Sequence, residues 1–294
     1  MRKAAGVMAD RAAKQDVLSA LRRDLSRLES PQEARPALSL GVAALDRRLT
    51  GGRGLILGGL HEIVGTAYPD MGAVSGFAAA LGARLTAQGS PPAKRALVWV
   101  VQGTGSHDLG LLYGPGLRML GLDPRQLVLV RVRDDREALW VTEEALKTPD
   151  LAGVVTELGG GRAYDLKASR RLQLAAEKFG RPALLLAGHA AGAASAPSAA
   201  LTRFRISSAA SATNPLTPAA PGRLRFSVHL DRVRGGAPCH FLMEWMHETH
   251  RFAVAARLSR GADAAPRRQG AGGAAAAARP QAPARARPAK KLAV

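Results

Sequence analysis

The residues from Gly65 to Gly72 follow a short apolar run and precede a helical pattern, the position of a phosphate-binding loop in an α/β sheet. Such a loop reads Gly-x-x-x-x-Gly-Lys-Ser/Thr, because backbone N–H groups surround the phosphates, the lysine contacts them and the hydroxyl holds Mg²⁺. Counting from Gly65 and Thr66, the second glycine, the lysine and the hydroxyl are replaced by Asp70, Met71 and Gly72. The sequence therefore predicts a loop of this shape that has lost its phosphate chemistry.

Other groups needed for nucleotide hydrolysis are also missing from their expected positions. No lysine occurs between Lys14 and Lys94, and the carboxylate of Asp70 would repel a phosphate group. No acidic residue lies between Met71 and His107, so the second expected strand ends without a base that could activate water. We therefore expect no catalytic residue, no nucleotide cofactor and no enzyme activity.

Two groups of residues resemble metal ligands but lack the composition or spacing of a metal site. Glu157 ends a further strand-like run, where it is a single carboxylate without a second ligand nearby in the sequence. Cys239, His240, His247 and His250 fall on alternating strand positions and a turn, and their spacing matches no standard zinc pattern. We expect no metal site.

Short apolar runs alternate with helical patterns between Leu38 and Ala187. The runs, which we interpret as strands, lie at Leu60–Val64, Leu97–Val101, Leu127–Val132, Gly153–Glu157 and Ala183–Ala187. The helical patterns lie at 73–88, 109–121, 136–147 and 166–179. Short, continuously apolar strands separated by helices are typical of a parallel sheet covered by helices on both faces. The sequence predicts an α/β fold with a doubly wound, mainly parallel sheet.

Beyond residue 188 the pattern changes to that of antiparallel strands. A stretch rich in Ala, Ser, Pro and Thr reads as two loops around a strand at 201–206. Apolar and polar residues then alternate strictly at 224–230, which indicates a half-buried strand, and strands at 241–245 and 252–256 follow. We expect these C-terminal strands to extend the sheet, with Trp245 in the core.

The two ends of the chain differ in composition from its central region. Residues 10–29 read as an amphipathic helix whose leucine stripe packs either on the main domain or on a partner. Residues 257–294, rich in Ala, Arg, Gly and Pro, bury too little apolar surface to offset the entropy of ordering and should be disordered. We therefore expect an N-terminal helix and linker at 1–36, a folded core at 37–256 and a basic tail at 257–294. The candidate partner-binding residues of the stripe are Leu18, Leu21, Leu25 and Leu28.

The chain carries a net charge of +19, and nine basic residues against Asp263 place +8 of it in residues 257–294. A strongly basic chain favours polyanionic partners, of which nucleic acid is the commonest. A genome whose codons favour arginine explains the same balance, so both readings stay open. The tail arginines taken as candidates for weak DNA binding are Arg267, Arg268, Arg285 and Arg287.

The remaining composition indicates a protein of the cytoplasm. The single cysteine, Cys239, excludes a disulfide within the chain and suits a reducing compartment. The N-terminal residues lack the apolar segment of a signal peptide, and no apolar stretch is long enough to span a membrane.

Several segments together resemble the start of a RecA-family core. They combine a Ser-Gly lead at 38–41, a Leu-Asp pair at 45–49, a glycine-rich turn at 51–54 and a strand at 60–65 that ends in Glu-Ile-Val-Gly. The segment 112–123 is similar to the RecA segment that follows the second strand. This resemblance covers roughly residues 38 to 230 and implies a RecA-like fold, although RecA itself keeps its phosphate loop.

A RecA-like core with a degenerate phosphate loop, an N-terminal leucine helix and a basic tail resembles the ImuA family. The resemblance implies a damage-induced accessory factor of translesion synthesis. It implies as partners an ImuB-type Y-family-like protein and an error-prone replicative-type DNA polymerase, with RecA and DNA as further contacts. In RecA-like proteins the loop before the strand at 201–206 approaches DNA. We therefore take Arg203 and Arg205, which alternation directs outward on both sides of Phe204, as further candidates for DNA binding.

Two other functions remain open. One is a residual nucleotide-binding switch, in which Arg53 or Arg84 substitutes for the missing lysine. The other is a SulA-like inhibitor that binds a cell-division filament protein, because the ImuA family resembles SulA as well as RecA.

Overall fold

The computed structural model describes residues 35–88, 95–102, 110–160, 163–187, 197–211, 214, 217 and 220–255. The predicted N-terminal helix and the predicted basic tail lie outside these residues. The candidate sites that therefore have no described position are Leu18, Leu21, Leu25, Leu28, Arg267, Arg268, Arg285 and Arg287.

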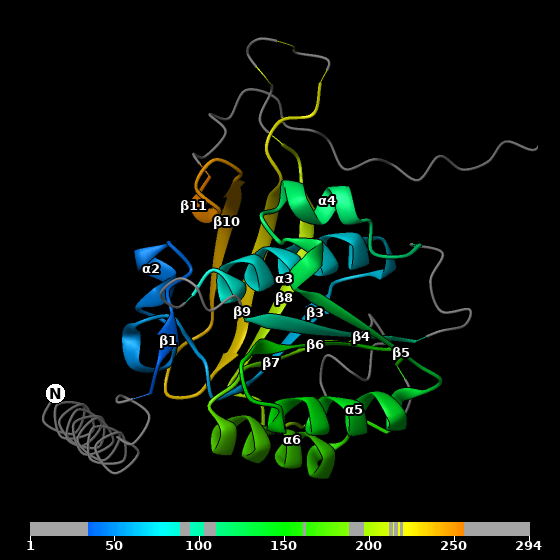
Figure 1. Ribbon diagram of the computed structural model, residues 1–294. Coiled ribbons are helices and arrows are strands. Elements are labelled where there is room, and N and C mark those ends of the chain that lie inside the picture. Colours follow the sequence, from blue (N-terminus) through cyan, green and yellow to red (C-terminus); the bar gives the residue numbers. More distant parts are fainter. Residues whose placement is uncertain are drawn as a thin grey trace, which may run out of the picture. The chain divides into compact units, whose positions relative to one another are not determined.

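A nine-stranded sheet organises the described residues, in the order β11-β10-β9-β8-β3-β7-β6-β4-β5 (Figure 1). The strands from β8 to β5 in this order are parallel, and β9, β10 and β11 are antiparallel to their neighbours. The prediction of a mainly parallel α/β sheet with antiparallel C-terminal strands is confirmed. The bounds are β3 Leu60–Gly65, β4 Ala96–Gln102, β5 Leu127–Val132, β6 Leu151–Leu158, β7 Ala183–Ala187, β8 Thr202–Ala209, β9 Arg225–Val233, β10 Cys239–Met246 and β11 Arg251–Val254.

Helices cover both faces of the parallel part of the sheet (Figure 1). One face carries α3 (Met71–Thr86) and the short α4 (Gly114–Met119), and the other carries α5 (Asp135–Lys147) and α6 (Leu166–Phe179). Each face has its own apolar cluster, which explains why β3 and β7 are buried along their whole length. The smaller elements are β1 Ala37–Leu38, β2 Leu55–Ile56, α2 Ala43–Asp46 and the 3₁₀ turns Thr50–Gly52, Tyr68–Asp70 and Pro124–Gln126.

The ends of α5 and α6 follow from local sequence. Asp134 and Asp165 precede α5 and α6, and each carboxylate accepts a hydrogen bond from a backbone N–H in the first turn. Such caps satisfy donors that have no partner inside the helix. The helix α6 ends at Gly180, whose φ of 63° is the left-handed conformation that glycine adopts without strain.

The predicted helix at 109–121 is too long, since the observed α4 spans six residues, Gly114–Met119. Pro115 lies in its first turn, where a missing N–H costs nothing, and Gly121 has a φ of 88°, which ends the helical path. The residues from Gly110 to Tyr113 are described and are not helical. A proline and a glycine therefore bound this helix more narrowly than its apolar pattern suggests.

The core on the α3 face is built around Phe77. Its ring lies 5.9 Å from that of Phe204, 5.7 Å from Phe226 and 5.1 Å from Phe252, measured between centroids. Trp245 is fully buried in the same cluster, as predicted. These contacts fix α3 to the antiparallel strands and so position the loop that precedes the helix. Among the described residues, no helix combines the length and apolar character needed to span a bilayer.

Candidate functional site

A cavity of about 170 Å³ lies where several parallel strands end and α3 begins. This edge of the sheet is where open α/β folds bind their ligands. Apolar side chains dominate the walls, and the polar contributions come from a serine, an amide and one carboxylate. The lining residues used below are Met71, Gln102, Leu111, Leu129 and Glu157.

The strand–loop–helix predicted at 60–74 is present, but a carboxylate takes the place of a phosphate. In Asp70, Oδ2 accepts a hydrogen bond from the Ala67 N–H at 3.1 Å, and Oδ1 accepts one from the Ser208 N–H at 3.1 Å. A phosphate-binding loop offers backbone N–H donors of this kind to its ligand. The chain's own carboxylate therefore occupies one backbone donor of the loop, that of Ala67, and joins the loop to β8 through Ser208.

The side chain of Met71 lies against the end of β3. A Cβ atom at Gly65 would lie 3.4 Å from Met71 Sδ and 3.2 Å from the Ala67 carbonyl oxygen. The thioether therefore lies beside the strand end, and Met71 stands where the lysine of a phosphate loop would be counted from Gly65. The described part of the loop brings no cation to this place, so nothing there offsets the charge of a phosphate.

Neither arginine proposed as a substitute for the lysine reaches the loop. Arg84 lies in the last turn of α3, about 20 Å along the helix from Met71. Its guanidinium donates to the carbonyl oxygens of Ser39 and His250, so the prediction that Arg84 replaces the lysine is wrong. Arg53 donates to the carbonyl oxygen of Arg35 in the segment that precedes β3, whereas the loop follows β3.

A second carboxylate reaches this edge of the sheet, and sequence reasoning missed it. Asp135, in the first turn of α5, accepts hydrogen bonds from Gln102 Nε2 at the end of β4 and from the Gly159 N–H. It is buried, and these contacts orient the Gln102 amide beside the cavity. The sequence does show an acidic residue at the start of a predicted helix. It does not show that this residue contacts Gln102, because that contact depends on the order of the strands.

The remaining acidic group, Glu157, accepts a hydrogen bond from Trp99 Nε1 at 2.8 Å. No group of three potential metal ligands occurs among the described residues. The histidines near Cys239 contact different parts of the fold, since His240 lies beside Ser227 and His247 beside the carbonyl of Met119. The described lining of the cavity is therefore suited to an apolar group, and it contains no cation that could meet a phosphate.

Arg203 lies in a buried ion pair, so the prediction that it points outward is wrong. Its Nε atom donates to Glu62 Oε2 at 2.5 Å, and Tyr164 Oη donates to Glu62 Oε1 at 2.5 Å. Burial and the charge of Glu62 raise the pKa of Tyr164 far above its usual range, which keeps the hydroxyl protonated as a donor. Arg203 thus holds β3, β8 and the segment before α6 together, out of reach of a nucleic acid.

Arg205 is the DNA-binding candidate whose side chain does face outward. It is 45% exposed and forms an ion pair with Asp231, with 2.6 Å between Nη2 and Oδ2. The pair reduces the charge that Arg205 offers to a phosphate.

Comparison with known proteins gives two close matches in sequence. No protein-family model matches the chain. The chain is 35% identical over 235 residues to "Protein ImuA" in each of two strains of Caulobacter vibrioides. The match covers 76% of this chain and 91% of each relative.

Proposed function

Since the chain belongs to the ImuA family, we propose that it is a non-catalytic accessory protein of a DNA-damage-induced mutagenesis complex. In this role it binds an ImuB-type Y-family-like protein in the cytoplasm and works with an error-prone replicative-type DNA polymerase in translesion synthesis. RecA and DNA are further contacts. The observation that carries the non-catalytic part is the occupation of the phosphate loop by Asp70 and Met71.

The arrangement of the site supports binding without hydrolysis. Removing the phosphate-contacting lysine removes the charge that a nucleotide needs, and Asp70 adds a charge of the wrong sign. Gln102, held by Asp135, stands at the end of β4 where a catalytic base would be expected, and an amide cannot accept a proton from water. What remains is the RecA-like scaffold with an apolar cavity at its ligand-binding edge.

Addition of MgATP should leave the midpoint of thermal unfolding unchanged. A ligand present at a hundred times its dissociation constant would stabilise the fold by about 2.7 kcal/mol, which differential scanning fluorimetry detects easily. Because the chain is strongly basic, tripolyphosphate serves as the matched control for non-specific anion binding. A saturable rise with MgATP that tripolyphosphate does not reproduce would favour the nucleotide-binding switch instead.

The SulA-like alternative makes a different prediction about the partner. If the chain inhibits cell division, the tagged protein should retain the cell-division filament protein and fail to retain the ImuB-type protein. The accessory role requires that the tagged protein retain the ImuB-type protein and fail to retain the cell-division filament protein.

A further inference from the structure

The strand β5 forms one end of the sheet. In the order of strands its only neighbour is β4, to which it is parallel. Among the described strands, nothing pairs with the outer side of β5, so its outward backbone N–H and C=O groups have no ladder partner. Such an edge is a template for pairing with another extended chain.

The sequence of β5 lacks the features that usually protect a sheet edge. Five of its six residues, Leu-Val-Leu-Val-Arg-Val, are apolar, and none is proline or lysine. Val128 is 48% exposed and Leu129 is 40% exposed, although every other parallel strand of the sheet buries its apolar residues more completely. Natural proteins usually shield an edge of this kind or use it for binding.

The cavity opens beside this edge, on the face that carries α3 and α4. Leu129 and Arg131 share this face, because their register partners on β4, Trp99 and Val101, belong to the apolar cluster under α3. Leu129 lines the cavity together with Leu111, which is 71% exposed. A strand added next to β5 would therefore place one side chain at the cavity and the next on that face beside Arg131.

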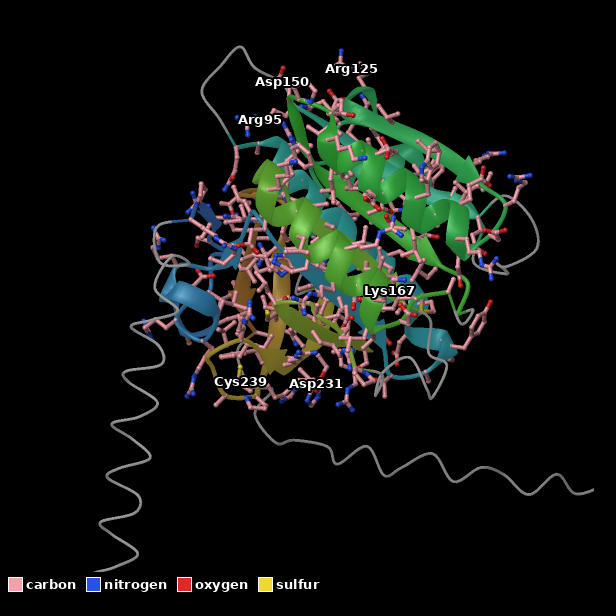
Figure 2. The ribbon with its side chains drawn as sticks, turned by 90° about the horizontal axis from the view of Figure 1, so that it is seen from below. Arg95, Arg125, Asp150, Lys167, Asp231 and Cys239 are labelled. Atoms are coloured by element: carbon pink, nitrogen blue, oxygen red, sulfur yellow. The ribbon has the colours of Figure 1, made fainter. Side chains whose placement is uncertain are left out.

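The charge at the edge favours an acidic occupant over a second copy of this chain. Arg131 is exposed, and no described residue forms an ion pair with it. Arg125 extends into solvent from the turn before β5 (Figure 2) and Arg133 is exposed just beyond its end, but both form ion pairs, with Asp123 and Glu137, so Arg131 is the main positive charge of this edge. With a net charge of +19 on each chain, two copies meeting at this edge would repel each other.

We infer that the β5 edge and the adjoining cavity form a docking site for an extended, acidic segment of a protein partner. The segment adds a strand to β5, inserts an apolar side chain beside Leu129 and places a carboxylate against Arg131. Main-chain hydrogen bonds supply affinity, and the cavity and the arginine select the sequence. This site is distinct from the candidate contacts in the N-terminal leucine stripe and the basic tail, and it does not depend on the proposed function.

The test uses a blocked, fluorescently labelled hexapeptide of sequence Glu-Thr-Leu-Thr-Glu-Ser with the full chain. Leucine and both glutamates fall on one face of a strand, so the peptide satisfies the site in either direction. Fluorescence anisotropy gives affinity, and hydrogen–deuterium exchange locates binding. We expect slower exchange at 127–132 and about five-fold weaker binding when lysine replaces both glutamates.

Three controls separate strand addition from general attraction to a basic protein. The same peptide with proline in place of leucine cannot pair with the strand and should protect nothing at 127–132. Arg131→Glu should reverse the preference, binding the lysine peptide better than the glutamate peptide. Val254→Glu, at the exposed opposite edge of the sheet, should leave both affinities unchanged. Equal binding of the proline peptide, or an unchanged preference in Arg131→Glu, would overturn the inference.

Discussion

Replacing Arg203 by methionine should lower the free energy of unfolding by about 3–5 kcal/mol. The side chains of Arg203 and Glu62 are 8% and 2% exposed, so the variant would leave a buried carboxylate without its counter-charge. Methionine keeps most of the apolar stem of arginine, which limits the contribution of a cavity. Urea unfolding followed by circular dichroism measures the change, since the transition midpoint falls in proportion to stability.

Arg205→Met is the matched control for this prediction. Arg205 lies two residues further along β8 and also forms an ion pair, but the pair is exposed to water. Exposed pairs contribute about 0–1 kcal/mol, so this variant should unfold close to wild type. Adding Glu62→Gln to Arg203→Met should recover much of the loss, because a neutral amide needs no counter-charge and still accepts from Tyr164. Equal losses for Arg203→Met and Arg205→Met would show that burial of the pair is not the source of its effect.

Stability should fall by about 3 kcal/mol as the pH drops from 6.5 to 4, because His61 resists protonation in the folded protein. Burial lowers the pKa of His61 from 6.5 to about 4, against the opposing effect of its hydrogen bond to Ile56. In the unfolded chain the histidine takes up a proton near pH 6.5, so protons favour unfolding across this window. Below about pH 4 both states are protonated and the contribution of this residue is fully lost.

Unfolding in urea at half-unit steps of pH measures this dependence. The ring of His61 lies 2.8 Å from the hydroxyl of Thr202 and 2.8 Å from the carbonyl oxygen of Ile56. Both oxygens can accept from the charged ring, so it is the burial of the ring that disfavours the charged form. His61→Gln should be less stable at neutral pH and should lose most of the slope between pH 6.5 and 4.5. His229, whose pKa burial lowers in the same direction, is only partly buried and serves as the comparison through His229→Gln. An unchanged slope in His61→Gln would contradict the assignment.

Periodicity predicted which segments are strands but could not predict their neighbours. The helix at 166–179 and the strands at 127–132 and 183–187 have the predicted bounds, because continuous apolar runs and capped amphipathic repeats determine them locally. The apolar run of β5 reads as a buried strand, yet its place at the end of the sheet leaves Val128 and Leu129 exposed. Strand order depends on packing between distant segments, which one sequence does not reveal.

The same dependence on strand order explains why the prediction for Arg203 was wrong and why Asp135 was missed. The residue types at fixed spacing around Asp70 and Met71, on which the prediction of lost phosphate chemistry rests, are visible in the sequence alone. Arg203 was placed outward because β8 alternates, but β8 pairs with β3 on one side and β9 on the other, and Glu62 lies 141 positions away in the sequence. Asp135 meets Gln102 for a comparable reason, since β4 and β5 are adjacent.

Co-purification of the tagged full chain from DNA-damaged cells, with and without nuclease treatment, tests the central claim most directly. The accessory role predicts that the ImuB-type protein and the error-prone polymerase are recovered after nuclease treatment. It also predicts that the Glu157→Gln variant recovers both proteins in the same amounts as the wild-type chain. That variant keeps the oxygen that accepts from Trp99 while removing the carboxylate in the cavity. Loss of both partners on nuclease treatment, or their absence from undigested samples, would contradict a direct scaffold role.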